Sequence, residues 1–139
     1  MSWFDSEKTK IRKSHIMNLL TLAMVDGHID RSEEEFLFNV ASRWGLEPTE
    51  FQDILKNPGK VKFNPPKTKN ESAEQLLDLV FMMMIDGKIR ESEMDLCKTL
   101  APSLGYPPSI VDKLVKFVVD GISQNIERDI LFKKVVAMN

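Results

Sequence analysis

The sequence predicts an all-α protein, a single compact bundle of about seven helices built from two pseudo-symmetric three-helix copies and a C-terminal helix. Apolar residues recur at helical spacing along most of the chain. No segment shows the sustained polar and apolar alternation of a half-buried strand. Residues 16–56 align without a gap on residues 76–116, which indicates an internal duplication. Two copies suit one globule better than a solenoid, which needs at least three.

Length and composition favour one domain spanning 1–139 and argue against several function classes. The chain has 139 residues, and a domain usually takes about 100–200. Its 19 basic and 21 acidic residues leave a net charge of −2, so nucleic-acid binding is not favoured. The single cysteine, Cys97, excludes an internal disulfide and a multi-cysteine zinc site. With only two histidines and no Gly-rich phosphate loop, we expect no enzyme.

The first helix of each copy is apolar on nearly every side, which is typical of a helix at the centre of a bundle. Both helices are expected to end at an Asp-Gly pair, where Gly27 and Gly87 adopt the left-handed conformation. The apolar positions that define these helices are Ile16, Leu19, Leu20 and Ala23 in one copy, and Leu76, Leu77, Val80, Phe81 and Met84 in the other.

The second helices are expected to begin near Ser32 and Ser92 and to end at Gly45 and Gly105. Ser32 with Glu35, and Ser92 with Asp95, have the spacing of a capping box. The third helices open around Pro48 and Pro108, because proline suits the first turn of a helix. A seventh helix is expected from about Ser123 to Ala137.

Between the copies lies a lysine-rich connector, residues 56–69, with five lysines and no acid. Its prolines and Gly59 prevent a continuous helix. A flexible, solvated linker is the preferred interpretation. Peripheral contact with an anionic surface is the alternative, and Phe63 alone is weak support for stacking on nucleic-acid bases.

The Asp-Gly segments have the spacing of the last eight positions of an EF-hand calcium loop. The earlier ligand positions fall on Leu22 and Met24, which cannot bind a hard cation, so a complete EF-hand is excluded. Half a loop remains in each copy, and its acids are candidate ligands for a weakly held Ca²⁺ or similar ion. These candidate metal ligands are Asp26, Asp30, Glu33, Asp86 and Glu93.

The two half-loops differ in charge. Asp26–Glu35 carries five acids and one base, whereas Asp86–Asp95 carries four acids and two bases. Arg90 stands where the first copy has Asp30, so one ligand is lost there.

A purely structural interpretation is equally open. Asp-Gly would close one helix, Ile29 or Ile89 would plug the turn into the core, and the serine would cap the next helix. An acid at a helix C-terminus destabilises the helix by roughly 0.3–1 kcal/mol. Either amide donors or a bound cation must therefore offset the charges of Asp26 and Asp86, which argues against the purely structural interpretation.

The motif Asp26-Gly27-His28-Ile29-Asp30-Arg31-Ser32-Glu33, its second copy and about seven helices resemble the TerB-like domain of tellurite-resistance proteins. The same domain heads the DjlA-type membrane-anchored co-chaperones. The resemblance covers about Ile11 to Val136 and implies an all-helical fold, a cytoplasmic stress-linked role and an acidic surface for divalent cations. By position, these acids are the five candidate ligands, and Arg90 departs from the pattern.

The other candidate residues favour structural roles. His28 is expected to be a solvated loop residue and His15 to be exposed beside a lysine and arginine cluster. Cys97 lies on an apolar stripe, so it is expected to be buried rather than nucleophilic. Met82, Met83 and Met84 are expected to fill the core.

Three functions follow, in order of preference. The first is a non-catalytic, cation-responsive stress protein, the second a protein-docking adaptor with structural turns, and the third a metal-dependent hydrolase. A protein partner is expected. The absence of a signal-peptide core and of a transmembrane-length apolar run leads us to expect a cytoplasmic protein.

Overall fold

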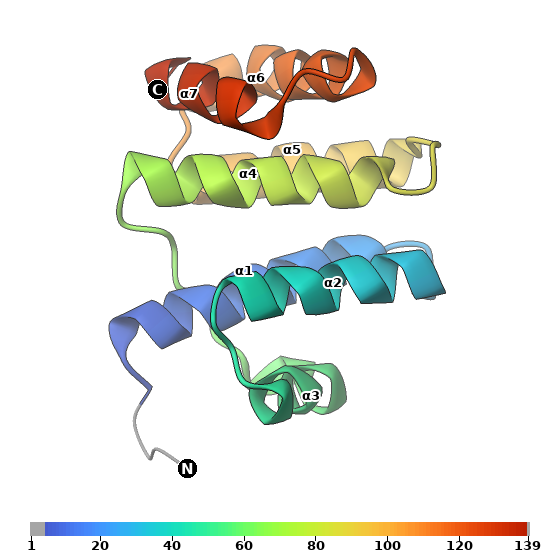
Figure 1. Cartoon of the computed structure of the whole chain (residues 1–139), viewed down its shortest axis with the longest axis vertical. Helices are drawn as coiled ribbons and strands as arrows, with labels where there is room; N and C mark the ends of the chain where they lie inside the picture. Colours follow the sequence, from blue (N-terminus) through green and yellow to red (C-terminus); the bar gives the residue numbers. More distant parts are fainter. Residues whose placement is uncertain (1–4, 139) are drawn as a thin grey trace. The chain divides into compact units, whose positions relative to one another are not determined.

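The structure, a computed structural model, describes residues 5–138. Within this range it contains α-helices, one 3₁₀ turn and no strand, which confirms the predicted all-α fold (Figure 1). The elements are α1 (Glu7–Ala23), α2 (Arg31–Arg43), α3 (Pro48–Lys56), the 3₁₀ turn η1 (Pro58–Lys60), α4 (Lys69–Met84), α5 (Glu91–Ser103), α6 (Pro108–Ser123) and α7 (Arg128–Met138).

The contacts divide the chain into two compact units, Met1–Pro65 and Pro66–Asn139. The first unit holds α1 to α3 and η1, and the second holds α4 to α7. Each unit therefore contains one copy of the duplication, and the C-terminal helix belongs to the second. That both units fold as one domain stays a prediction.

In the first unit, α1 packs against α2 and α3, α2 packs against α3, and η1 packs against α3. Apolar side chains at helical spacing fill the space between these helices. The buried set includes Ile16, Leu19, Leu37, Val40, Phe51 and Ile54.

In the second unit, α4 packs against α5, α6 and α7, and α6 also packs against α5 and α7. Having neighbours on three helices explains why α4 is apolar nearly all round, as predicted for a central helix. Seven of its apolar side chains are fully buried, namely Ala73, Leu76, Leu77, Leu79, Val80, Met82 and Met83.

The predicted helix ends are confirmed. The four glycines that were expected to stop helices have left-handed φ angles, which a residue without a Cβ adopts at little cost. They are Gly27 (100°), Gly45 (82°), Gly87 (79°) and Gly105 (107°).

The second helix of each copy begins near Ser32 and Ser92 as predicted, but the predicted capping boxes are wrong. The N-cap of α2 is Asp30, because its carboxylate reaches the amide of Glu33, and the N-cap of α5 is Arg90. The last helix begins at Arg128 instead of about Ser123, since α6 continues to that serine.

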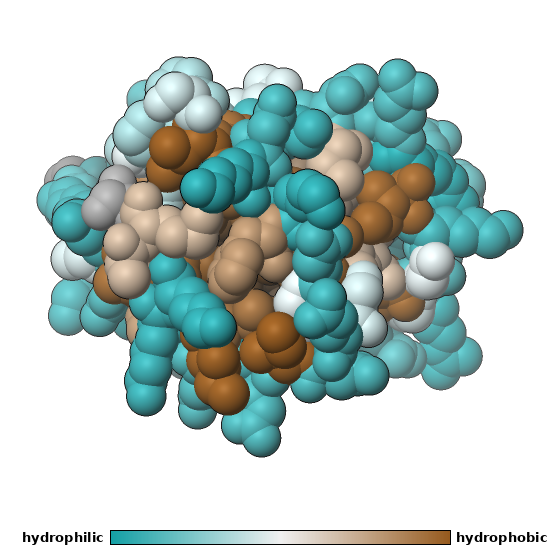
Figure 2. Space-filling view, turned by 90° about the horizontal axis from the view of Figure 1, so that it is seen from above, coloured by the Kyte–Doolittle hydropathy of each residue, from teal (hydrophilic) through white to brown (hydrophobic). Residues whose placement is uncertain are grey.

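No helix of residues 5–138 is both long and apolar enough to cross a membrane. Figure 2 shows the face formed by α6 and α7, where apolar side chains lie between polar ones. Ile130 of α7 is 45% exposed and contributes to the apolar surface of the chain, whereas Leu131 and Val135 of the same helix are fully buried.

Candidate functional site

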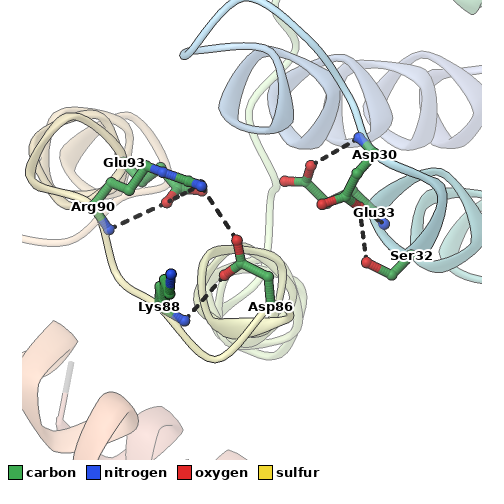
Figure 3. Close-up of polar contacts among 7 residues, drawn as sticks. All are labelled: Asp30, Ser32, Glu33, Asp86, Lys88, Arg90 and Glu93. Carbon is green, nitrogen blue, oxygen red and sulfur yellow. Dashed lines mark hydrogen bonds and ion pairs between the residues drawn. The ribbon is translucent and has the colours of Figure 1, made fainter.

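The acidic turn of the first copy is organised as a helix cap. Asp30 Oδ1 accepts hydrogen bonds from the Glu33 amide at 2.9 Å and from the Ser32 hydroxyl at 2.8 Å (Figure 3). Glu33 Oε1 in turn accepts from the Asp30 amide at 3.1 Å, which completes a capping box. The Glu33 amide and the Ser32 hydroxyl lower the pKa of Asp30, because both bonds favour its ionised form.

The turn of the second copy carries its own cation. Arg90 Nη1 lies 3.3 Å from Asp86 Oδ2 and 3.7 Å from Glu93 Oε1, so one guanidinium bridges the two carboxylates. Glu93 Oε1 also accepts from the Arg90 amide at 3.2 Å, as in the capping box of the first copy. Figure 3 shows Arg90 directed back towards Asp86.

Asp86 follows the C-cap of α4, where the helix dipole disfavours a carboxylate. Its Oδ1 accepts from the Lys88 amide at 3.1 Å, and its Oδ2 is paired with Arg90. The charge of Asp86 at the end of α4 is therefore offset by a local amide and by the guanidinium of Arg90, as expected from the sequence for a carboxylate at this position.

The predicted ligands do not form a compact cluster within a unit. Among the residues that the structure describes, no three His, Cys, Asp or Glu side chains form a group that could hold a metal ion. Asp26 and His28 are exposed, and Asp30 is partly exposed, whereas Glu33 and Glu93 are buried against their caps. Metal binding by Asp26, Asp30, Glu33, Asp86 and Glu93 thus stays a prediction.

Two expectations about the turns and their surroundings are wrong. Ile89 is 39% exposed and does not plug its turn into the core. His15 is fully buried instead of exposed, with its ring edge-on to Trp44 at 5.5 Å. The reason is helical spacing: His15 lies one turn from Ile11 and one turn from Leu19, on the buried face of α1.

Cys97 is buried as predicted. Burial raises the pKa of its thiol to about 12, which keeps it in the unreactive protonated form at neutral pH. Met82 and Met83 are also fully buried, as expected for core residues, whereas Met84 is partly exposed.

Sequence reasoning missed an ion cluster between α4 and α7. Arg128 Nη2 lies 2.8 Å from Glu74 Oε2 and 3.0 Å from Asp78 Oδ1, and Asp78 is fully buried. The Arg128 guanidinium also lies over the Phe81 ring, 5.5 Å from its centroid. The available signal was Asp78, the only acid within the apolar stretch of residues 76–84, with Glu74 one turn before it.

The lysine-rich connector is more structured than a simple linker. It contains η1, which packs on α3, and the Asn64 amide donates to Ser14 Oγ at 2.9 Å. Its lysines 56, 60, 62, 67 and 69 are exposed.

Two surface hollows of the first unit are lined by exposed aromatic rings, those of Phe38 and Phe63. One, of about 410 Å³, lies between α2 and α3, where the rings of Phe38 and Phe51 meet edge-on at 5.5 Å. The other, of about 340 Å³, lies between α1 and the connector and is lined by Lys10, Lys60 and Phe63 among others.

The low pKa of Asp30 makes its contribution to stability depend on pH. Its folded-state pKa lies below the ordinary value of 3.8, so the stabilisation is present above that value and is lost as the pH falls through the folded pKa. Asp30→Asn should therefore be less stable than wild type at neutral pH, with a difference that shrinks in acid. Urea unfolding between about pH 6 and pH 2 measures this difference, and a difference that stays constant would contradict the role of the carboxylate.

Comparisons with protein-family models, curated proteins and solved structures found no match for this chain. The resemblance to the TerB-like domain therefore rests on the duplicated Asp-Gly motif and the helical pattern.

Proposed function

We propose that this protein is a non-catalytic helical module that binds a divalent cation weakly at the acidic turn of its first copy. The observation that carries the proposal is the place of Arg90 in the second copy. There the guanidinium supplies positive charge to both Asp86 and Glu93. The first copy repeats these acids as Asp26 and Glu33 but has Asp30 in place of the arginine.

The local charge supports the same assignment. The first turn shares the helix ends and the capping geometry of the second, yet it replaces one positive side chain by a negative one. A divalent cation would restore the balance that Arg90 provides in the second copy. The low pKa of Asp30 keeps its carboxylate ionised and able to act as a ligand at neutral pH.

We expect the cation to bind weakly and to keep several of its coordinated waters. The bonds of Asp30 to its cap partners both use Oδ1, so Oδ2 is available to coordinate a cation. A site with one or two carboxylates suits a cation that keeps several waters, with a Kd of about 1 mM. Occupancy would neutralise the turn and stabilise the beginning of α2.

A stress-linked, cytoplasmic role is part of this proposal, as the TerB-like resemblance implies. A protein partner and contact with anionic surfaces through the 56–69 connector belong to it as further predictions.

Exchanging residue types between the copies tests the proposal. Asp30→Arg should abolish cation binding, because it introduces the arginine of the second copy. Arg90→Asp should add a second site. Asp30→Asn keeps a good N-cap but removes a charge, so binding should weaken about ten-fold or more while α2 stays capped. Calorimetric titration with Ca²⁺, Mg²⁺ and Mn²⁺, and Mn²⁺ broadening of the amide NMR signals of residues 26–33, measure these changes.

Asp112→Asn is the matched control, since it removes an exposed acid of α6 that pairs with Lys98 at 3.3 Å. It should leave binding unchanged. Equal binding by wild type and Asp30→Arg, or no signal with wild type at about ten times the expected Kd, would refute the cation site.

The second candidate function is a protein-docking adaptor with purely structural turns. The hollow beside Phe38 favours it, because this ring is 43% exposed and lies among Arg31, Glu34 and Glu35. The capping boxes also give the turn acids a role that needs no ion. Failure of the cation titration would leave this function as the better-supported one.

A further inference from the structure

The hollow between α1 and the connector combines positive charge with an exposed aromatic ring. Its lining includes Lys10 of α1 and Lys60, Lys62 and Phe63 of the connector. Phe63 is 49% exposed, the highest value among the large apolar side chains described as exposed. We call these four residues the lysine hook.

The lysines of the hook lack counter-ions within the described residues. Lys13, which also lines the hollow, lies 2.8 Å from Asp5 and 3.6 Å from Glu50. By contrast, the side chains of Lys10, Lys60 and Lys62 form no ion pair with any residue of the range 5–138. Four lysines and two aspartates, Asp5 and Asp53, line the hollow, so it carries a net positive charge on a chain whose net charge is −2.

The hook is held in place before any ligand arrives. Asn64, next to Phe63, donates its amide to the buried hydroxyl of Ser14, and its side chain donates to the carbonyl of Lys62 at 3.1 Å. The preceding η1 packs against α3. Binding therefore needs little ordering of the backbone, which lowers its entropic cost.

We infer that the lysine hook binds the surface of an anionic phospholipid membrane. The three lysines would contact lipid phosphates, and the Phe63 ring would enter the headgroup region. A single aromatic ring offers no series of stacking platforms for a nucleic-acid strand. The overall negative charge does not prevent this contact, since charges further away than about 8 Å are largely screened at physiological salt.

Vesicle sedimentation tests the inference with the full chain. Wild type should bind vesicles with about one third phosphatidylglycerol in phosphatidylcholine, and binding should fall as salt increases. Lys60→Gln/Lys62→Gln should weaken this binding about 25-fold, about five-fold for each lysine. Phe63→Ala should weaken it about five-fold at unchanged charge.

The matched control is Lys133→Gln/Lys134→Gln, which removes two exposed neighbouring lysines from α7. It should bind vesicles within two-fold of wild type, and all variants should unfold thermally as wild type does, because the substituted side chains are exposed. If the control loses as much vesicle binding as Lys60→Gln/Lys62→Gln does, the effect is one of unspecific charge and the inference is overturned.

Three further results would also overturn it. These are equal binding to pure phosphatidylcholine vesicles, competition by inorganic phosphate at the lipid phosphate concentration, and binding to a single-stranded RNA oligonucleotide or to polyglutamate without binding to vesicles.

Discussion

Replacing Arg128 by alanine is expected to lower the free energy of unfolding by about 3–5 kcal/mol, the largest effect of any substitution considered for this protein. Arg128 joins α7 to α4 through Glu74 and Asp78. Asp78 is fully buried, so removing the guanidinium leaves its negative charge in the interior without the cation 3.0 Å away. The loss of the stacking on Phe81 adds to the cost.

Chemical denaturation at neutral pH measures this effect. The double variant Asp78→Leu/Arg128→Met is the control, because it replaces the buried carboxylate and its guanidinium partner by apolar side chains of similar size and should recover most of the loss. Glu74→Gln should cost far less, since Glu74 is about one third exposed at 34% of its side chain. A cost below about 1 kcal/mol for Arg128→Ala would show that the cluster behaves as a surface ion pair.

Gly121→Ala is expected to destabilise the protein by about 2 kcal/mol, although the same change in an exposed helix usually stabilises by about 1 kcal/mol. Gly121 lies inside α6, and a Cβ placed on it would lie next to Leu131 Cδ2 of α7. Leu131 is fully buried, so its side chain has little room to move away. The contact between α6 and α7 would have to open.

Gly59→Ala is the matched control, because a Cβ there meets no atom within 4 Å, and its stability should stay within about 0.5 kcal/mol of wild type. Leu131→Val in the Gly121→Ala background tests the steric cause: it removes one methylene at the clash and should cost less there than in wild type. If the losses in the free energy of unfolding caused by Gly121→Ala and Leu131→Val simply add in the double variant, direct contact between the two side chains is contradicted.

The sequence alone predicted the class and most of the elements of this fold. The duplication of residues 16–56 in residues 76–116, the helical spacing and the four helix-ending glycines all correspond to what the structure contains. These features are local, since they depend on backbone conformation and on which face of a helix is apolar. The local errors were the start of α7 and the capping residues of α2 and α5, where Asp30 and Arg90 occupy the N-cap positions instead of Ser32 and Ser92.

The candidate site was predicted only in part. The sequence identified the acids of the two turns, but not that Asp30 and Glu33 cap one helix or that Arg90 bridges Asp86 and Glu93. Charge counts cannot supply this information, because they do not specify which atoms meet.

Contacts between side chains that are far apart in the sequence could not be predicted from its periodicity. His15 sits among basic residues in the chain, yet its face of α1 is buried. Asp78 and Arg128 are 50 positions apart and meet only because α7 packs on α4.

The dipeptide Asp-Gly illustrates the division between local and tertiary information. It occurs at Asp26-Gly27, Asp86-Gly87 and Asp120-Gly121. In the first two, glycine adopts a positive φ just beyond a helix. The local sequence determined this role, because an apolar helix precedes each of these glycines and a capped helix follows it. In the third, Gly121 stays within α6, and what it provides is space for Leu131. Only the packing of α7 on α6 decided that role, because close approach between helices depends on residues that are distant in the chain.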